Sequence, residues 1–332
     1  TSIDLYDYKT QSKVAALVDS KDLDAIPYFT NYTFSADESK IILATEVESI
    51  YRRSTLGVFF VYDIASKQLQ KVSDSKIQEP TFSPDASKVA YGFNNNLYLK
   101  DLKSDREKQI TFDGEKNKII NGITDWVYEE EFAFVRAYEW NANGQKIAFL
   151  RFDETAVKEF SMDVYGQALY QTQQVFKYPK AGEQNAVVSL HIYNLNKDLT
   201  NEVKLEKSYN DFYIPRIKWT SEASILSAQY INRHQNELDL WAIDTASNTS
   251  SILLTETDAA YVDVTDNLTF LKDNSFIWTS EKDGHNHLYH YSKKGKLINQ
   301  LTQGNWEVTA YYGCDEKSKR IYYQSVENGS IN

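Results

Sequence analysis

Three consecutive glutamates, at positions 129–131, are the residues of this chain whose type and spacing most directly suggest chemistry. They close the segment 125–131, which reads Asp-Trp-Val-Tyr-Glu-Glu-Glu. Adjacent residues of a helix are rotated by ~100°, so two of these carboxylates can flank a wedge and reach one small cation. A primary ammonium offers three N–H donors that two carboxylates can accept. The segment therefore suggests a site that binds a free amino terminus.

An alternative interpretation of the same segment is a short solvated helix with an acidic outer face. Asp125 suits the N-cap of such a helix, and negative charge is favourable in its N-terminal half in either case. The apolar side chains of Trp126, Val127, Tyr128 and Phe132 favour the binding interpretation, because they would anchor the helix firmly in an apolar setting. The residues alone leave both interpretations open.

The rest of the chain offers little other chemistry. No serine lies in a Gly-x-Ser-x-Gly turn, and the sequence contains no His-Glu-x-x-His, phosphate-binding or dinucleotide-binding motif. His285, His287 and His290 are the nearest approach to a metal cluster, and a strand would place only the first two on one face. Because no carboxylate lies in register with these histidines, we interpret them as surface or blade-edge residues. Cys314 is the single cysteine, so it can form neither an internal disulfide nor a cysteine-based zinc site. We expect no metal and no cofactor.

Composition excludes several classes of function. The net charge of −11 makes nucleic acid an unfavourable partner, because an acidic chain repels phosphates. The longest uninterrupted apolar run, residues 56–62, is far shorter than the ~20 residues that a membrane-spanning helix needs. The chain opens at Thr1 without a leader, so we expect that any signal peptide has been removed or is not included.

A recurring sequence motif predicts the β-strands that position the glutamates. The motif consists of an aromatic residue, then a polar turn containing Asp or Asn, and then a strand. Examples are Thr-Phe-Ser-Ala-Asp from Thr33 and Thr-Phe-Ser-Pro-Asp from Thr81. The anchoring aromatics are Phe34, Phe82, Trp140, Trp219, Phe270 and Tyr312. We expect them to be core residues that pack one sheet on the next. Short strands at this spacing predict an all-β chain, a β-propeller with about six repeat units and an insertion in the long gap between Trp140 and Trp219.

Several segments together resemble one family. Asp-Trp-Val-Tyr-Glu-Glu-Glu is similar to the double-glutamate motif of the dipeptidyl peptidase IV family, the prolyl-oligopeptidase-type serine exopeptidases. Further similar segments occur in the family's order, and those at 264–267 and 276–280 resemble its bacterial branch. These further segments are Tyr-Arg-Arg-Ser at 51–54, Arg-Phe-Asp-Glu at 151–154, Tyr-Pro-Lys-Ala-Gly at 178–182 and Gly-Asn-Trp-Glu-Val at 304–308. The resemblance implies an eight-bladed propeller above an α/β-hydrolase domain, with residues 1–332 forming a partial propeller and the catalytic domain absent from this chain.

The resemblance also assigns roles to particular residues. It implies that Glu130 and Glu131 bind the ammonium of a peptide substrate, and that Arg52 contacts the carbonyl of the penultimate residue and pairs with Glu130. Arg53 is a neighbour that could be confused with Arg52. Two departures from the mammalian pattern put specificity beyond the first two substrate residues in doubt. Phe134 replaces a small polar residue, and an aromatic-and-arginine loop has no counterpart around residues 259–264.

The function implied is the substrate-gating and amine-recognising part of a post-proline dipeptidyl aminopeptidase, whose parent releases Xaa-Pro or Xaa-Ala dipeptides. The alternative is a non-catalytic propeller that binds peptides or proteins, and a tripeptidyl relative is a third option. The partners implied are peptides with a free N-terminus and the chain's own hydrolase domain, with a homodimer left open. The location implied is the periplasm or the cell surface of a bacterium, or secretion from it.

Overall fold

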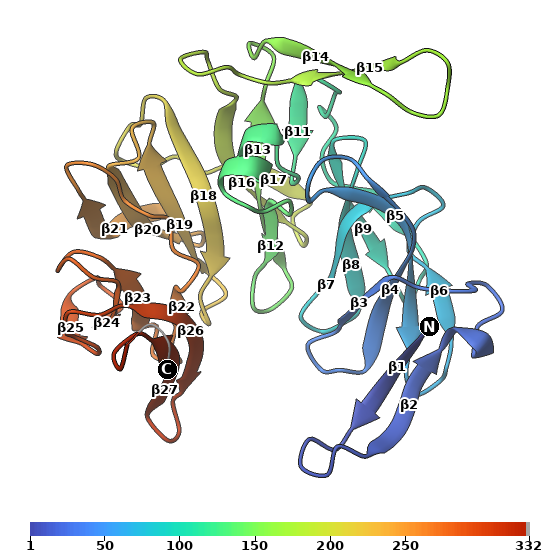
Figure 1. Cartoon of the computed structure of the whole chain (residues 1–332), viewed down its shortest axis with the longest axis horizontal. Coiled ribbons are helices and arrows are strands. Elements are labelled where there is room, and N and C mark those ends of the chain that lie inside the picture. The colour runs from blue at the N-terminus through green and yellow to red at the C-terminus, as the bar shows by residue number, and fades with distance from the viewer. Residues whose placement is uncertain (330–332) are drawn as a thin grey trace. The chain divides into compact units, whose positions relative to one another are not determined.

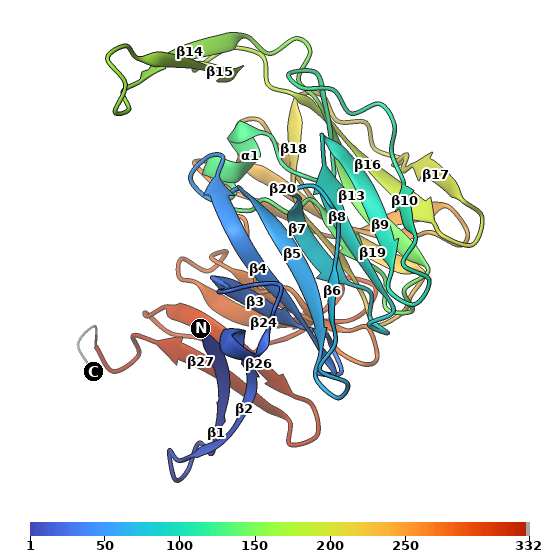
Figure 2. The ribbon, with the colours of Figure 1, turned by 90° about the vertical axis from the view of Figure 1, so that its right-hand side faces the viewer.

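The computed structural model describes residues 1–329 and is built almost entirely of β-strands (Figures 1 and 2). In that range there are 27 strands, one α-helix and one short 3-10 helix, Ser20–Asp22. The chain divides into two compact units, Thr1–Asn201 and Glu202–Asn332. None of the helices described is long and apolar enough to span a membrane.

The first unit contains the strands up to β17, which ends at the boundary, and the helix α1 (Trp126–Glu131). Its first ten strands are β1 (Ser2–Tyr6), β2 (Lys13–Asp19), β3 (Asn31–Phe34), β4 (Lys40–Ser49), β5 (Thr55–Asp63), β6 (Leu69–Lys71), β7 (Gln78–Phe82), β8 (Lys88–Phe93), β9 (Asn96–Asp101) and β10 (Glu107–Gln109). The remaining seven are β11 (Ile119–Asn121), β12 (Tyr138–Trp140), β13 (Lys146–Asp153), β14 (Glu159–Val164), β15 (Thr172–Lys177), β16 (Val187–Asn194) and β17 (Leu199–Glu202).

The second unit repeats the same kind of sheet. Its strands are β18 (Phe212–Trp219), β19 (Ile225–Asn232), β20 (Glu237–Asp244), β21 (Thr249–Thr257), β22 (Thr269–Phe270), β23 (Phe276–Ser280), β24 (His287–Tyr291), β25 (Leu297–Gln300), β26 (Val308–Asp315) and β27 (Arg320–Ser325). Four consecutive strands pair antiparallel in β18–β21 and again in β22–β25, and β26 pairs with β27.

In the first unit the same pattern forms the sheets β3–β6 and β7–β10. A five-stranded sheet follows, in which β13 lies between β16 and the short strands β11 and β12. Sheets made of four consecutive antiparallel strands are the blades of a β-propeller. The prediction of an all-β propeller chain is therefore confirmed. The prediction of about six units is also confirmed, because the six anchoring aromatics lie in six separate sheets. Five of them lie on the first strand of their sheet, and Trp140 lies on β12, the second strand of the five-stranded sheet.

Two features interrupt this regular succession, and both lie in the third sheet. Helix α1 occupies the connection between β11 and β12, and the hairpin β14–β15 occupies the connection between β13 and β16. The hairpin is the insertion expected between Trp140 and Trp219. The segment that carries the three glutamates is thus a connection within a sheet and not a strand.

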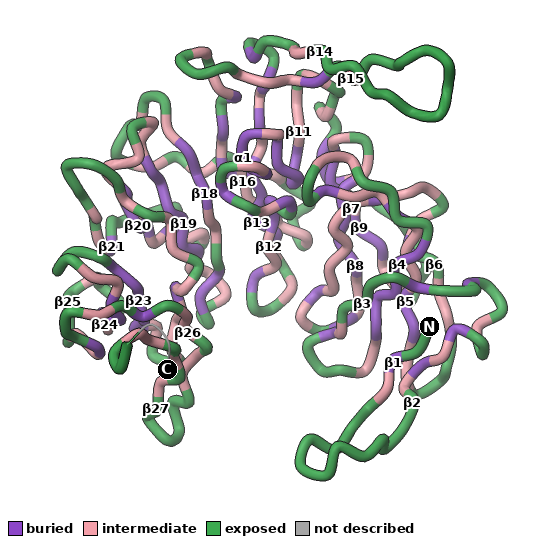
Figure 3. Tube along the Cα trace, in the orientation of Figure 1, coloured by how far each residue is buried: buried purple, intermediate pink, exposed green. Residues whose placement is uncertain are grey.

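Burial follows the middle strands of each sheet, as Figure 3 shows. Phe34, Phe82 and Trp140 each pack against a cluster of buried apolar side chains, as expected for core aromatics. The prediction is wrong for Tyr312, whose side chain is 68% exposed. An irregularity in the β26–β27 pairing between Tyr311 and Gly313 explains the difference, because it turns Tyr311 toward the apolar cluster instead.

Candidate functional site

Helix α1 is short, and local interactions define both of its ends. The Asp125 side chain accepts a hydrogen bond from the backbone N–H of Tyr128 at 2.9 Å, which confirms the predicted N-cap. At the other end, the N–H of Phe132 donates to the carbonyl of Tyr128 at 3.1 Å. Val127, Tyr128 and Phe132 are buried, so the helix is anchored on its apolar side. This anchoring holds the glutamates in fixed directions.

Glu129 is the buried member of the triplet, with 1% of its surface exposed. Its Oε1 accepts hydrogen bonds from the backbone N–H groups of Arg53 at 2.6 Å and Ser54 at 2.9 Å. Two successive N–H groups of a turn form a small anion-binding nest, and they supply the partners that a buried carboxylate requires. The solvated-face interpretation is therefore wrong for Glu129, which ties α1 to the turn between β4 and β5.

These two hydrogen bonds of Glu129 place Arg52 next to Glu130. The Nε of Arg52 donates to both carboxylate oxygens of Glu130, at 2.9 and 3.1 Å, so the expected ion pair is present. The Arg52 side chain is 71% exposed, whereas the Glu130 side chain is 19% exposed. In the described chain the other N–H groups of this guanidinium have no hydrogen-bond partner. Arg52 can therefore orient Glu130 and still donate to a further acceptor.

The other residues near the triplet differ in their surroundings. Glu131 is exposed and forms no ion pair or hydrogen bond with the residues that the structure describes. Arg53 is exposed too, and only its backbone N–H contacts α1. Phe134 packs edge-on against the ring of Tyr128 at 6.0 Å, so it supports α1 from behind. Of the three predicted binding residues, the structure thus joins Arg52 and Glu130 directly and leaves Glu131 free at the end of the helix.

The Arg52–Glu130 pair faces a recess of about 570 Å³. Its walls include four aromatic side chains, Trp126, Phe160, Phe176 and Tyr178. Trp126 and Tyr178 are in close contact, with ring centroids 4.2 Å apart. Tyr178 belongs to one of the segments that resemble the family, whereas Phe160 and Phe176 lie on the inserted hairpin in no motif that the sequence reveals. An ion pair beside an aromatic wall suits a ligand that carries both charge and apolar surface.

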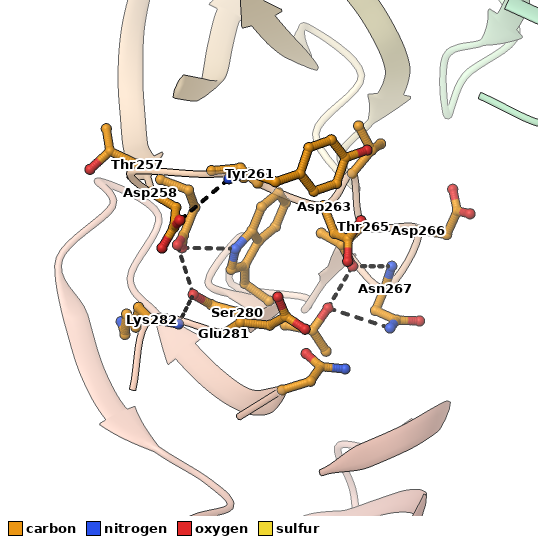
Figure 4. Close-up of a pocket in the computed structure, with 16 residues that line it drawn as sticks. Thr257, Asp258, Tyr261, Asp263, Thr265, Asp266, Asn267, Ser280, Glu281 and Lys282 are labelled. Carbon is orange, nitrogen blue, oxygen red and sulfur yellow. Dashed lines mark hydrogen bonds between the residues drawn. The ribbon is translucent and has the colours of Figure 1, made fainter. Parts of the chain in front are cut away.

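A second recess, of about 390 Å³, lies in the second unit (Figure 4). It includes the loop around residues 259–264, where an arginine-bearing loop was found to be missing. Tyr261 lines it, and Asp258, Asp263 and Glu281 make it acidic. Burial, with the like charge of Asp263, raises the pKa of the Glu281 carboxyl. This wall attracts cations, whereas a wall built around an arginine would attract anions.

The histidines do not form a comparable site. His287 is fully buried, and its Nδ1 and Nε2 lie 3.0 Å from Thr302 Oγ1 and the carbonyl oxygen of Gly304. The expected surface role is therefore wrong for His287, because its ring fills the interior and satisfies both nitrogens there. His285 precedes β24, so it does not lie on the same strand face as His287. Across residues 1–329, no group of three or more His, Cys, Asp or Glu side chains is arranged to hold a metal.

Comparison with known proteins agrees with this architecture. Residues 35–332 match the family described as the dipeptidyl peptidase IV (DPP IV) N-terminal region. The crystal structure of Porphyromonas gingivalis dipeptidyl peptidase 4 superposes with a TM-score of 0.94 at 38% identity, covering 100% of this chain and 48% of that one. A Bacteroides ovatus protein described as a dipeptidyl aminopeptidase IV gives a TM-score of 0.66 at 25% identity, covering 84% of this chain and 42% of that one.

Curated relatives extend the similarity to fungi. Dipeptidyl-aminopeptidase B of Aspergillus niger is 31% identical over 328 residues, which cover 88% of this chain and 36% of the relative. The chain is an all-β, propeller-type segment. It belongs to the dipeptidyl peptidase IV family and corresponds to that family's N-terminal region. It spans little more than a third of the length of the fungal relative and about half of the P. gingivalis enzyme.

Proposed function

We propose that this chain is the substrate-gating and amine-recognising propeller of a serine-type, post-proline dipeptidyl aminopeptidase. The observation that carries the proposal is the Arg52–Glu130 ion pair beside Glu131, set on a helix that Glu129 anchors. Membership of the dipeptidyl peptidase IV family supplies the reaction class. The parent would release Xaa-Pro or Xaa-Ala dipeptides through an acyl-enzyme formed in its own α/β-hydrolase domain.

In this proposal Glu130 and Glu131 bind the substrate ammonium. Two carboxylates ~4 Å apart repel each other by about 4 kcal/mol at an effective dielectric of 20. The Arg52 guanidinium offsets this repulsion, and the arriving ammonium completes the neutralisation with charge-assisted hydrogen bonds. The unused N–H groups of Arg52 then donate to a carbonyl oxygen of the bound peptide.

Fixing the ammonium also fixes the register of the peptide. If the N-terminal residue is held at α1, the bond after the second residue is the one presented to the catalytic serine, and this positioning lowers the entropic part of the barrier. Glu130 and Glu131 therefore both bind the ammonium and determine which peptide bond is cleaved. The location we propose is the periplasm or the surface of a bacterium, which follows from the resemblance to the bacterial branch and is testable by cell fractionation.

The decisive experiment compares two substrates of the full-length protein, Gly-Pro-p-nitroanilide and its N-acetylated form. We expect turnover of the first, with kcat/KM at least about 10²-fold higher than for the second, because acetylation removes the ammonium that the glutamates bind. Equal turnover of both substrates would refute amine recognition. Binding of the peptide Gly-Pro-Ala without any turnover would favour the non-catalytic alternative.

A further inference from the structure

A cavity of about 800 Å³ lies within the first unit and adjoins the Arg52–Glu130 recess. The side chains of Trp126 and Phe176 line both spaces, with ring centroids 6.5 Å apart, so they form a shared wall. Tyr51 continues the wall inside the larger space, 5.6 Å from Phe176. We call this larger space the Glu154 cavity, after the carboxylate that distinguishes it.

Glu154 follows β13 and is only 6% exposed. Its backbone is fully engaged, because its N–H donates to the carbonyl of Lys118 and its carbonyl accepts from Val157. Its carboxylate lines the cavity, yet it has no hydrogen bond or ion pair with any residue in the described part of the chain. A largely buried carboxylate without a partner is costly. Another buried carboxylate of this region, Glu129, is satisfied by two N–H donors.

The charged groups around Glu154 form no ion pair with it, although the nearby Lys177 charge attracts it and the Asp125 and Asp153 charges repel it. Asp125 adds a second buried carboxyl, whose oxygen is already used to cap α1. The Lys177 ammonium donates to the carbonyl of Val157 at 2.7 Å, and the Lys76 ammonium pairs with Glu48. The remaining charged groups of this cavity, Glu115 and Lys116, are exposed. Burial, then repulsion from Asp125, raises the pKa of the Glu154 carboxyl to about 7.

We propose that the Glu154 cavity is a second cation-binding site, which takes an organic ligand bearing a primary ammonium on an apolar stem. Glu154 supplies the acceptor for the ammonium, and the faces of Tyr51, Trp126 and Phe176 attract a cation as well as its stem. One free carboxylate is a poor donor set for a hard metal ion, which requires six or more oxygens. Because Trp126 and Phe176 also line the Arg52–Glu130 recess, a ligand in the Glu154 cavity contacts two side chains that both sites share.

The probe is n-butylammonium chloride, titrated calorimetrically into the full-length protein at pH 8, with n-butanol as the neutral ligand of similar shape. We expect butylammonium to bind at least about tenfold more tightly than butanol. Glu154→Gln should weaken butylammonium binding at least about tenfold, while the exposed carboxylate variant Glu206→Gln should leave it unchanged. Equal binding to wild type and Glu154→Gln, or no binding beyond that of butanol, would overturn the proposal.

Two further variants separate this site from its neighbours. The double variant Glu130→Gln/Glu131→Gln should retain the Glu154-dependent binding, and loss of that binding would assign it to α1 instead. Val175 is exposed and lines the cavity, so Val175→Lys supplies an ammonium from the chain itself. We expect Val175→Lys to abolish butylammonium binding and Val175→Leu to preserve it. Unchanged binding in Val175→Lys would count against the site even if Glu154→Gln failed to fold.

Discussion

The carboxylate of Glu129 and the backbone N–H of Ser54 meet at 2.9 Å, although 75 residues separate them in the sequence. With the adjacent N–H of Arg53, this contact fastens α1 to the turn that carries Arg52. The candidate site therefore depends on a buried glutamate that faces away from the proposed ligand. In the triplet, one glutamate positions the helix and its neighbours remain available for binding.

Removing this anchor should destabilise the protein. Glu129→Ala leaves two buried N–H groups without an acceptor, which should lower the free energy of unfolding by roughly 2–4 kcal/mol. Glu129→Gln should cost less, because its amide oxygen can still accept both hydrogen bonds. Urea denaturation checks this, with the exposed neighbour Glu131→Ala expected to change stability by no more than about 0.5 kcal/mol. Equal stability of Glu129→Ala and Glu131→Ala would contradict the anchoring role.

Truncating the two proposed binding residues should impair catalysis and leave folding intact. In the full-length protein, Glu130→Ala and Glu131→Ala should each reduce kcat/KM on a Xaa-Pro substrate by roughly 10²-fold, because each removes a charge-assisted hydrogen bond to the ammonium. Melting temperatures of the same preparations serve as the control. Near-wild-type turnover in both variants would return these glutamates to the role of a solvated surface.

The two adjacent arginines should behave differently. Arg52→Ala removes the partner of Glu130 and the donors for a substrate carbonyl, so we expect kcat/KM to fall by at least about tenfold. Arg53→Ala leaves the backbone N–H that binds Glu129 in place and should retain activity. The pair is a matched comparison of two exposed arginines on one turn. A larger loss for Arg53→Ala than for Arg52→Ala would reverse the assignment.

Stability should depend on pH through Glu154. Its pKa is raised from 4.5 to about 7, so the folded state favours the protonated carboxyl, chiefly because the group is buried. This contribution is complete below about pH 4.5 and is lost as the pH rises through about 7. Glu154→Gln should match wild type near pH 4.5 and be more stable at pH 8, by at most about 3 kcal/mol. Urea unfolding at the two pH values tests this, and a constant difference between the proteins would be inconsistent with it.

Residues 1–332 expressed alone should not hydrolyse Gly-Pro chromogenic substrates. The reason is that the sequence contains no Gly-x-Ser-x-Gly turn to present a nucleophile. A serine-reactive fluorophosphonate probe provides a second measurement, which should leave this chain unlabelled. Turnover that survives purification together with labelling of a serine in this chain would disprove the prediction.

The sequence predicted those parts of the fold that repeat. An aromatic residue before each polar turn marked an early strand in each of six sheets, because a large apolar side chain is favoured in the core wherever the unit recurs. The prediction was wrong at Tyr312, where a pairing irregularity exchanges the buried and exposed positions of β26. It was also wrong at His287, because alternation along a strand does not reveal which face becomes the interior.

The site was predictable only where its chemistry is local. The cap at Asp125 and the apolar anchors of α1 follow from neighbouring residues, and both were predicted. The distinct role of Glu129 was not predictable, because its partners are backbone N–H groups, which any sequence offers. The lone Glu154 carboxylate was missed for a related reason, since a missing partner becomes visible only when the surroundings are known.

Consecutive strands pair in most of the sheets described, so most of the strand hydrogen bonds join residues that are near neighbours in sequence. The contacts that hold α1 against the turn at Ser54 are among the exceptions, with separations of 75 to 78 residues. Contacts of long sequence separation must await closure of the intervening loop. We therefore expect the candidate site to be completed late in folding, after the sheets that flank it have formed. A chain arrested before that step would contain native-like blades and yet lack the Arg52–Glu130 pair.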